Sequence, residues 1–400
     1  MNIINKVAFL VHEPTMYTHY SSVWSEMAQT DFTIVLYSRF NNKIQDISPG
    51  AKDFINKIVK LEYEFYYFND LLRDKIKFKY VVSNHVIGGI SARPAPLKTK
   101  LANNAKNLLK DIINVFYRIS NDADKYHICF SDPVQYLPTQ IGVHQIRFMY
   151  GADISDGWSL QSWNEIYDLF LCHGPNDEAQ IRKRFKGKTV VMGYPRYDRF
   201  FLPNLDVGNI AREFGIDPSK KTILWMTTIG EGACSIPYFA KAISGLFSEY
   251  NIIVRPHPLS FRKEPYNIDL LKSLSFTIDE DATRDMNELF KVADWVLCDY
   301  GGSSFGAIYL GKNLILLDVP GSDSEFTVVD SSNLELRDYF PVVSPEDACK
   351  LKLVIEDDAQ IKTQEVNRRS LFARYFADYR GSSSRRAAEI LSNLDSLLEA

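Results

Sequence analysis

The stretch that decides the fold is Ala293-Asp-Trp-Val-Leu-Cys-Asp-Tyr-Gly-Gly-Ser-Ser-Phe-Gly-Ala-Ile-Tyr-Leu-Gly-Lys-Asn-Leu-Ile-Leu-Leu317. The apolar run Trp295–Cys298 predicts a buried strand, and the glycines after it predict a tight turn. A helix-length segment follows, and Leu314–Leu317 predicts the next strand. A strand, a turn, a helix and a second strand in this order are typical of a parallel α/β sheet.

The same alternation of short apolar runs and helix-length segments continues along the chain in both directions. Predicted strands in the first half are 7–11, 32–37, 80–83, 127–130, 145–150, 169–173 and 189–192, and those in the second half are 222–226, 251–254, 276–278, 295–298 and 314–317. Between the halves, Gly193-Tyr-Pro-Arg-Tyr-Asp198 and Phe200-Phe-Leu-Pro-Asn204 interrupt the series with one glycine and two prolines. We therefore expect two α/β units joined by this connection.

The composition excludes several classes of protein. The 400 residues are 46% hydrophobic and 13% aromatic, which supplies far more burial than a disordered chain has. The 46 basic and 50 acidic residues give a net charge of −4, so no basic field points to nucleic acid as a partner.

Compartment and membrane signals point to a cytoplasmic protein. The five cysteines are widely spaced and form no C-x-x-C pair, which indicates buried thiols in a reducing compartment. The first apolar run, Val7–Val11, is too short for a signal peptide, and no run of about 18 apolar residues is present.

One segment departs from the alternating pattern. Residues 98–118 carry apolar side chains at helical spacing with lysines and an arginine around them. Such a stripe is usually a helix that covers a core. It is also the pattern of a helix lying on an anionic membrane surface, so a peripheral contact at the inner face of the cytoplasmic membrane stays open.

The turn at Gly301, Gly302, Ser303 and Ser304 is the first candidate site. Free backbone N–H groups and the positive dipole end at a helix N-terminus attract anions, and glycines let a phosphate approach the backbone. An ordinary N-cap serine after a glycine turn would have the same sequence.

A second motif, Arg255-Pro-His-Pro258, follows another predicted strand. Ligands of parallel sheets bind beyond the carboxyl ends of the strands, so Arg255 and His257 fall on the same edge as the serines. A guanidinium and an imidazole can hold phosphate or carboxylate oxygens.

Three motifs together resemble those of the CDP-glycerol glycerophosphotransferase family and of the bacterial retaining β-Kdo transferases of capsule and O-antigen synthesis. They are Gly193–Asp198, Arg255–Pro258 and Asp299-Tyr-Gly-Gly-Ser-Ser304. The resemblance implies a GT-B fold: two Rossmann-like domains with a cleft between them, the donor mostly on the second. It also implies a cytidine nucleotide donor bound by Tyr300 as well as by the residues above, without a required metal. Asp122-Ala-Asp124 has the D-x-D form of a metal motif but precedes a strand, and is interpreted as a solvated turn.

Two departures bear on the choice between these families. Glycerophosphotransferases carry a Trp-His-Gly element whose histidine is their base, and Tyr150 stands there in this chain. A phenol with a pKa near 10 is a poor base at neutral pH, which weakens glycerol-phosphate transfer. In the β-Kdo transferases the segment matching Thr227–Ile236 contains a nucleophilic Asp, and here that position is Ala233. Either Glu231 takes this role, or Ala233 marks an enzyme that has lost its nucleophile, or the resemblance misleads.

The first domain is expected to hold the acceptor. Tyr150, Asp153, Asp156 and Trp158 follow a predicted strand, and carboxylates with an aromatic face suit sugar hydroxyls, although Asp156 with Gly157 is also an ordinary turn and Trp158 an ordinary core residue. His12, Glu13 and His19 follow the first strand, and the sequence does not decide whether they face the cleft.

The sequence hypothesis is therefore a cytoplasmic GT-B glycosyltransferase. Its expected parts are an acceptor domain at 1–200, a donor domain at 201–370, and helices at 371–400 that cross back. The expected reaction moves Kdo from CMP-Kdo to a lipopolysaccharide O-antigen or capsule glycan, lipid-linked, with retention through a glycosyl-enzyme. Ala233, Glu231 and His257 are the catalytic positions, and no metal or other cofactor is expected. The alternatives are CDP-glycerol or polyol phosphotransfer, and an inactive nucleotide-binding domain.

Overall fold

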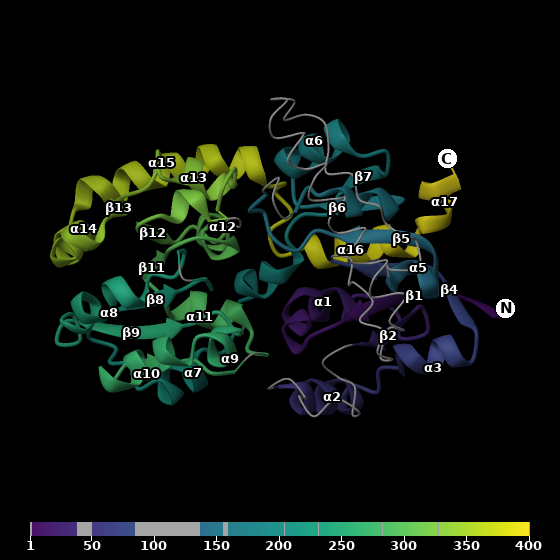
Figure 1. The fold of residues 1–400 in the computed structure, drawn as a ribbon, viewed down its shortest axis with the longest axis horizontal. Helices are drawn as coiled ribbons and strands as arrows, with labels where there is room; N and C mark the ends of the chain where they lie inside the picture. Colours follow the sequence, from purple (N-terminus) through teal and green to yellow (C-terminus); the bar gives the residue numbers. More distant parts are fainter. Residues whose placement is uncertain are drawn as a thin grey trace, which may run out of the picture.

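The computed structural model describes residues 2–37, 50–84, 137–154, 159–203, 205–230, 232–281, 283–325 and 328–399. Two parallel sheets lie side by side, each with helices on its faces (Figure 1). This is the expected architecture of two Rossmann-like α/β domains.

The first sheet has seven strands in the order β3-β2-β1-β4-β5-β6-β7. Its strands are β1 (Asn2–Val11), β2 (Phe32–Leu36), β3 (Phe65–Tyr67), β4 (Ile76–Ser83), β5 (Gly142–Phe148), β6 (Leu169–Cys172) and β7 (Lys188–Val191). Its helices are α1 (Tyr17–Trp24), α2 (Ala51–Lys60), α3 (Phe68–Arg73), α5 (Leu137–Ile141) and α6 (Pro175–Arg184). The strand order reverses between β1 and β4, so loops after these strands open a crevice at the carboxyl edge.

The second sheet has six strands in the order β10-β9-β8-β11-β12-β13. Its strands are β8 (Lys221–Met226), β9 (Tyr250–Arg255), β10 (Thr277–Ile278), β11 (Trp295–Cys298), β12 (Asn313–Leu317) and β13 (Val342–Val343). Its helices are α7 (Gly208–Glu213), α8 (Ile236–Ser244), α9 (Ser260–Lys263), α10 (Pro265–Ser273), α11 (Met286–Val292), α12 (Gly302–Tyr309), α13 (Ser332–Leu336), α14 (Leu351–Ile355) and α15 (Asp358–Tyr375). Here the order reverses between β8 and β11, and the loop after β11 is the glycine-serine turn.

Every predicted strand within the described residues coincides with an observed one, and 127–130 lies outside them. The sequence pattern missed β3 and β13, which are three and two residues long. Runs this short carry too little periodicity to be recognised.

The connection between the halves forms the 3-10 helix η5 (Pro195–Phe201), which both halves hold. Ser22 of the first half donates to the Pro195 carbonyl (3.1 Å), and the Asn287 side chain of the second half donates to the Arg196 carbonyl (2.9 Å). The loops at the carboxyl ends of the two sheets meet, because Asp153 after β5 lies against Gly302 after β11.

The last helices, α16 (Ser383–Ser392) and α17 (Leu394–Glu399), return to the first half, as expected (Figure 1). Apolar side chains of α16 share one core cluster with β1 and α1. The buried Asp198 fixes the start of α16, because its carboxylate accepts the N–H groups of Gly381 and Ser384. The expected domain limits at 200 and 370 stay predictions.

Candidate functional site

The glycine-serine turn, Gly301–Ser304, begins α12, at the point where the second sheet reverses its strand order. Gly301 has φ 97° and ψ −175°, a backbone conformation that only glycine adopts without strain. Ser304 follows on the first turn, and its buried Oγ has no hydrogen-bond partner among the described residues. The helix start thus presents backbone N–H groups and hydroxyls at this edge of the sheet, which is the arrangement that binds anions.

Buried Asp299 ties this turn to the loop after β8. Its Oδ1 accepts the backbone N–H groups of Thr228 and Tyr300, both at 2.8 Å. Its Oδ2 accepts the N–H and the hydroxyl of Ser235, both at 2.9 Å. Burial raises the pKa of Asp299 to about 6, although these hydrogen bonds lower it. Asp299 therefore positions both loops of the candidate site.

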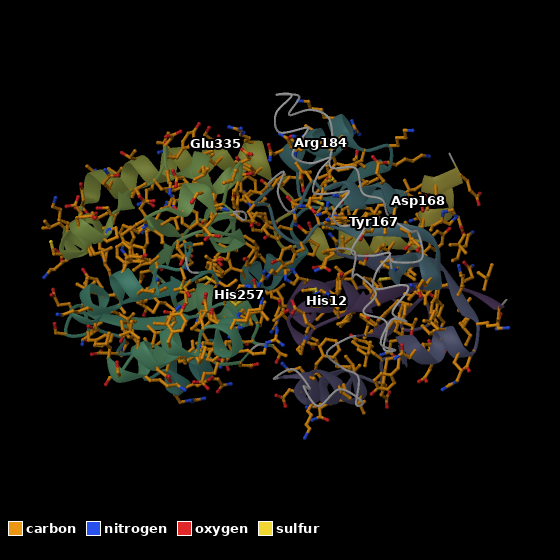
Figure 2. The ribbon with its side chains drawn as sticks, viewed as in Figure 1. His12, Tyr167, Asp168, Arg184, His257 and Glu335 are labelled. Atoms are coloured by element: carbon orange, nitrogen blue, oxygen red, sulfur yellow. The ribbon has the colours of Figure 1, made fainter. Side chains whose placement is uncertain are left out.

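His257, on the loop after β9, is only partly buried. Its Nδ1 accepts the backbone N–H of Leu259 at 3.1 Å, so the neutral ring carries its proton on Nε2. The ring is thereby set up as a hydrogen-bond donor. Figure 2 shows His257 and His12 on the sides of the two halves that face each other.

Arg255 has a partner within its own domain. Its Nη1 lies 2.6 Å from Oδ2 of the fully buried Asp279 and also donates to the carbonyl of Asp281 at 2.6 Å. Burial lowers the pKa of the guanidinium, and Asp279 opposes that effect. The structure thus places Arg255 in a buried ion pair, while its expected contact with donor phosphate stays a prediction.

Tyr300 is also turned into its own domain. Its hydroxyl donates to Asp318 Oδ1 (3.1 Å) and contacts Ser322, and the Arg337 guanidinium lies 4.0 Å above its ring. Only its backbone takes part in the turn, through the N–H group that Asp299 accepts.

Ala233, expected at the position of a nucleophile, does not face the cleft. Its methyl group is buried in an apolar cluster with Tyr300, Val319 and Val328. The Ala233 N–H donates to the Gly230 carbonyl (3.0 Å), a turn that directs the side chain inward. A carboxylate there would be buried among apolar groups, which does not favour attack on a sugar, and the expected role of Ala233 as the nucleophile position stays a prediction. Glu231 lies outside the described residues.

The first half contributes Tyr150 and Asp153, on the loop after β5. If Gly302 carried a Cβ, that atom would lie 3.1 Å from Asp153 Oδ1, so this carboxylate lies against the start of α12. Loss of hydration raises the pKa of Asp153 to about 6. Loss of hydration and the neighbouring negative charge of Asp153 together raise the pKa of Tyr150 to about 12. Asp156 and Trp158, the other expected acceptor residues, lie outside the described residues.

Two buried histidines lie near the loop after β5: His19 beside Tyr150 and His173 near Asp153. The buried His19 ring packs on Tyr150, with ring centroids 5.0 Å apart, and burial lowers its pKa well below the usual value. His12 lies 3.6 Å from Glu13, measured from Nε2 to Oε1. The buried His173 is held by Asp177 at 3.0 Å from its Nδ1, and its Nε2 has no hydrogen-bond partner among the described residues.

Arg196 is the cleft residue that the sequence interpretation missed. Its buried Nε has no hydrogen-bond partner, and its guanidinium forms no ion pair with any described residue. Its positive charge nonetheless lowers the pKa of Asp153 and of Tyr150 from nearby. Arg196 stands in the motif Gly193–Asp198, which was interpreted only as a connection between the halves and as a family motif.

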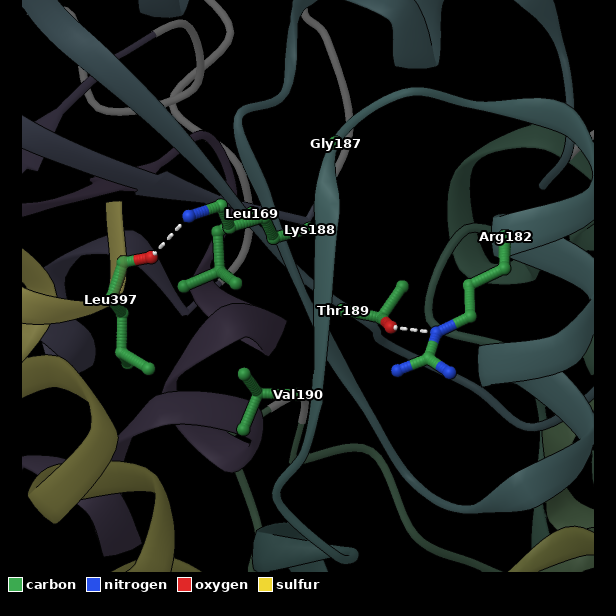
Figure 3. A pocket seen from close by; sticks show the side chains of 7 residues that line it. All are labelled: Leu169, Arg182, Gly187, Lys188, Thr189, Val190 and Leu397. Carbon is green, nitrogen blue, oxygen red and sulfur yellow. Dashed lines mark hydrogen bonds between the residues drawn. The ribbon is translucent and has the colours of Figure 1, made fainter. Parts of the chain in front are cut away.

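One hollow of the first half lies at the edge of its sheet. A cavity of about 320 Å³ lies between the edge strand β7 and α17, where Lys188 donates to the Leu397 carbonyl (3.0 Å) and Arg182 to Thr189 (2.7 Å) (Figure 3). It contains none of the candidate residues, which lie instead where the loops at the carboxyl ends of the two sheets meet.

Comparison with known proteins decides the family. The sequence pattern of the CDP-glycerol:poly(glycerophosphate) glycerophosphotransferases matches residues 117–389. The chain belongs to this family. It is therefore a transferase, and the expected retaining transfer of Kdo is wrong, because the match covers most of the chain and supports the alternative reaction instead.

Solved structures show the same fold at low sequence identity. The wall teichoic acid polymerase TagF is 13% identical with a TM-score of 0.63, and the match covers 100% of this chain and 91% of that one. A complex of MnaA from S. aureus with UDP is 12% identical (TM-score 0.57; 99% and 98% covered), and a UDP-N-acetylglucosamine 2-epimerase is 14% identical (TM-score 0.55; 99% and 97% covered). No curated protein matches.

Two other expectations concern the membrane and metals. No helix among the described residues is long and apolar enough to cross a membrane, and residues 98–118 lie outside them. Within the same described ranges, no three His, Cys, Asp or Glu side chains are grouped as metal ligands.

Proposed function

We propose that this glycerophosphotransferase-family member transfers glycerol phosphate, or a related polyol phosphate, from a CDP-activated donor to a hydroxyl group of a surface-polymer acceptor. The observation that carries the proposal is the set of groups on the facing sides of the two halves: the α12 N-terminus, His257, and Arg196, which forms no ion pair with a described residue. All three favour a ligand with several phosphate oxygens. TagF, in whose structure CDPG was soaked, has the same fold.

The reaction is a displacement at the phosphorus that carries the glycerol. The oxygen of the acceptor hydroxyl forms a bond to this phosphorus as the bond to the bridging oxygen of CMP breaks, and CMP leaves with the electron pair. The backbone N–H groups at Gly302 and Ser303 would bind the equatorial oxygens, where negative charge is spread in the transition state. The Nε2–H of His257 would donate to the departing phosphate.

The donor requires no metal in this proposal, because the chain's own positive groups can neutralise the leaving CMP. Such a nucleotide-activated donor is available in the cytoplasm, where we expect the protein to act. A lipid-linked acceptor and a membrane contact through residues 98–118 remain parts of the proposal that need separate tests.

The test measures CMP release from CDP-glycerol in the presence of a glycerol phosphate oligomer. CDP-ribitol, CMP-Kdo and UDP-N-acetylglucosamine serve as competing donors in the same assay. We expect release with a CDP-polyol alone, and calorimetry should show binding of CDP-glycerol but not of UDP. Release from CMP-Kdo or the UDP-sugar, without release from either CDP-polyol, would contradict the proposal.

A further inference from the structure

Transfer to a hydroxyl group needs an acceptor for its proton, and the cleft offers few groups for this role. The phenol of Tyr150, with its pKa raised to about 12, stays protonated at neutral pH. His257 carries its proton on Nε2 and is a donor. His19 is buried, with 4% of its surface exposed, and lies behind the Tyr150 ring.

Asp153 is an ionisable group of the first half that lies against the glycine-serine turn. Its Oδ1 lies 3.1 Å from the position of a Cβ on Gly302. It also lies so close to Gly151, two residues earlier in the chain, that a side chain there would displace the carboxylate. The carboxylate is thus held against the start of α12, where the donor phosphate would bind. An acceptor hydroxyl that attacks this phosphate would lie within hydrogen-bond reach of Oδ1.

We propose that Asp153 is the general base of the transfer: Oδ1 takes the proton of the acceptor hydroxyl as its oxygen bonds to the phosphorus and CMP departs with the electrons of the broken P–O bond. This assignment rests on the proposed function. The assignment goes beyond the proposed function because it gives the proton to a carboxylate of the opposite domain. The base and the glycine-serine turn therefore come together only when the two halves face each other.

The surroundings of Asp153 suit a base. Charged and titratable groups from three elements act on it: Tyr150 after β5, His173 after β6, and Tyr194, Arg196 and Tyr197 around η5. Burial raises the pKa of Asp153 to about 6, although a hydrogen bond from its own backbone N–H and the nearby Arg196 guanidinium lower it, so the carboxylate is mostly deprotonated at pH 7. A base of this strength is matched to work near neutral pH.

A purely structural role makes different predictions. If Asp153 served only to cap α12 across the cleft, its loss would weaken the turn and therefore donor binding. If it is the base, replacing it with a neutral side chain removes a negative charge beside the phosphate, and donor binding stays equal or becomes tighter.

The experiment compares Asp153→Asn with wild type in CMP release from CDP-glycerol, with Asp70→Asn on the exposed face of α3 as a matched control. We expect kcat to fall about 10²- to 10⁴-fold in Asp153→Asn. Calorimetry should give a CDP-glycerol affinity equal to that of wild type or tighter, and Asp70→Asn should match wild type in both measurements. The acidic limb of the wild-type profile of kcat/KM against pH should disappear in the variant.

A second variant, Asp153→Ala, makes room for an added carboxylate, and formate should restore part of its activity. Asp153→Asn activity within tenfold of wild type would overturn the assignment alone. The assignment would also be overturned if CDP-glycerol binding weakened in proportion to the lost activity and formate restored none of it. A wild-type protein that releases no CMP from a CDP-polyol and binds none would overturn the proposed function and the assignment together.

Discussion

Arg255 and Arg196 can be tested for two different roles: Arg255 is expected to stabilise the fold, and Arg196 is expected to bind the donor. Arg255 is 7% exposed and pairs with Asp279, which is 1% exposed. Removing one partner of a buried ion pair typically costs about 3–5 kcal/mol. Because Arg284 Nε stays 2.7 Å from Asp279 Oδ1, we expect Arg255→Met to destabilise the protein by about 3 kcal/mol, at the low end of that range.

Arg196→Met is the matched control, since this guanidinium forms no ion pair with the described residues. Its loss should change the free energy of unfolding by less than about 1 kcal/mol. Loss of a charge-assisted contact of about 1.5–3 kcal/mol should weaken CDP-glycerol binding roughly 10- to 150-fold. Urea unfolding followed by tryptophan fluorescence and calorimetry with CDP-glycerol measure both effects on each variant.

The opposite pattern would refute this reasoning. If Arg255→Met unfolds within about 1 kcal/mol of wild type while losing more than tenfold in CDP-glycerol affinity, Arg255 binds the donor and its pair with Asp279 is dispensable. An Arg196→Met variant with unchanged affinity would remove Arg196 from the site.

Three further changes have defined outcomes. Ala233→Asp should lower the unfolding midpoint in urea and give no new activity, because the carboxylate would enter an apolar cluster; a faster enzyme would show that this side chain reaches the cleft. Gly301→Ala should lower the unfolding free energy by about 1–3 kcal/mol because of the φ of 97° at this position. A steric clash does not contribute, since the nearest atom to the new Cβ, Thr228 Oγ1, is 3.8 Å away. Equal stability would mean that the turn has another conformation. EDTA should leave CMP release unchanged, and activity lost to EDTA and regained with magnesium would contradict metal independence.

Much of the fold was predictable because parallel strands that are buried on both faces read as continuous apolar runs. Trp295–Cys298 and Leu314–Leu317 are such runs, and both are strands. The two shortest strands escaped because two or three residues have no pattern of their own. The edge of the sheet at which the glycine-serine turn lies was predictable too, since it follows from strand direction alone.

The directions of individual side chains could not be predicted. The partner of Arg255 is Asp279, 24 residues further on, and the pair exists only because β10 lies beside β9 in the sheet. The inward turn of Ala233 depends on a loop whose shape the buried Asp299 determines. The choice between two families that share their motifs likewise needed the match over the whole segment 117–389.

The return of α16 has a consequence for the order in which the protein can fold during synthesis. Ala387, Ile390 and Leu391 belong to the same core as Phe9 and Trp24, so the first domain buries its apolar face with residues that are translated after the whole second domain. Until α16 leaves the ribosome, that face of β1 and α1 stays open to water and to chaperones. The second domain, whose core clusters lie within 152–376 and contain none of these residues, can complete its packing earlier. The domain that comes first in the sequence is thus finished after the second domain.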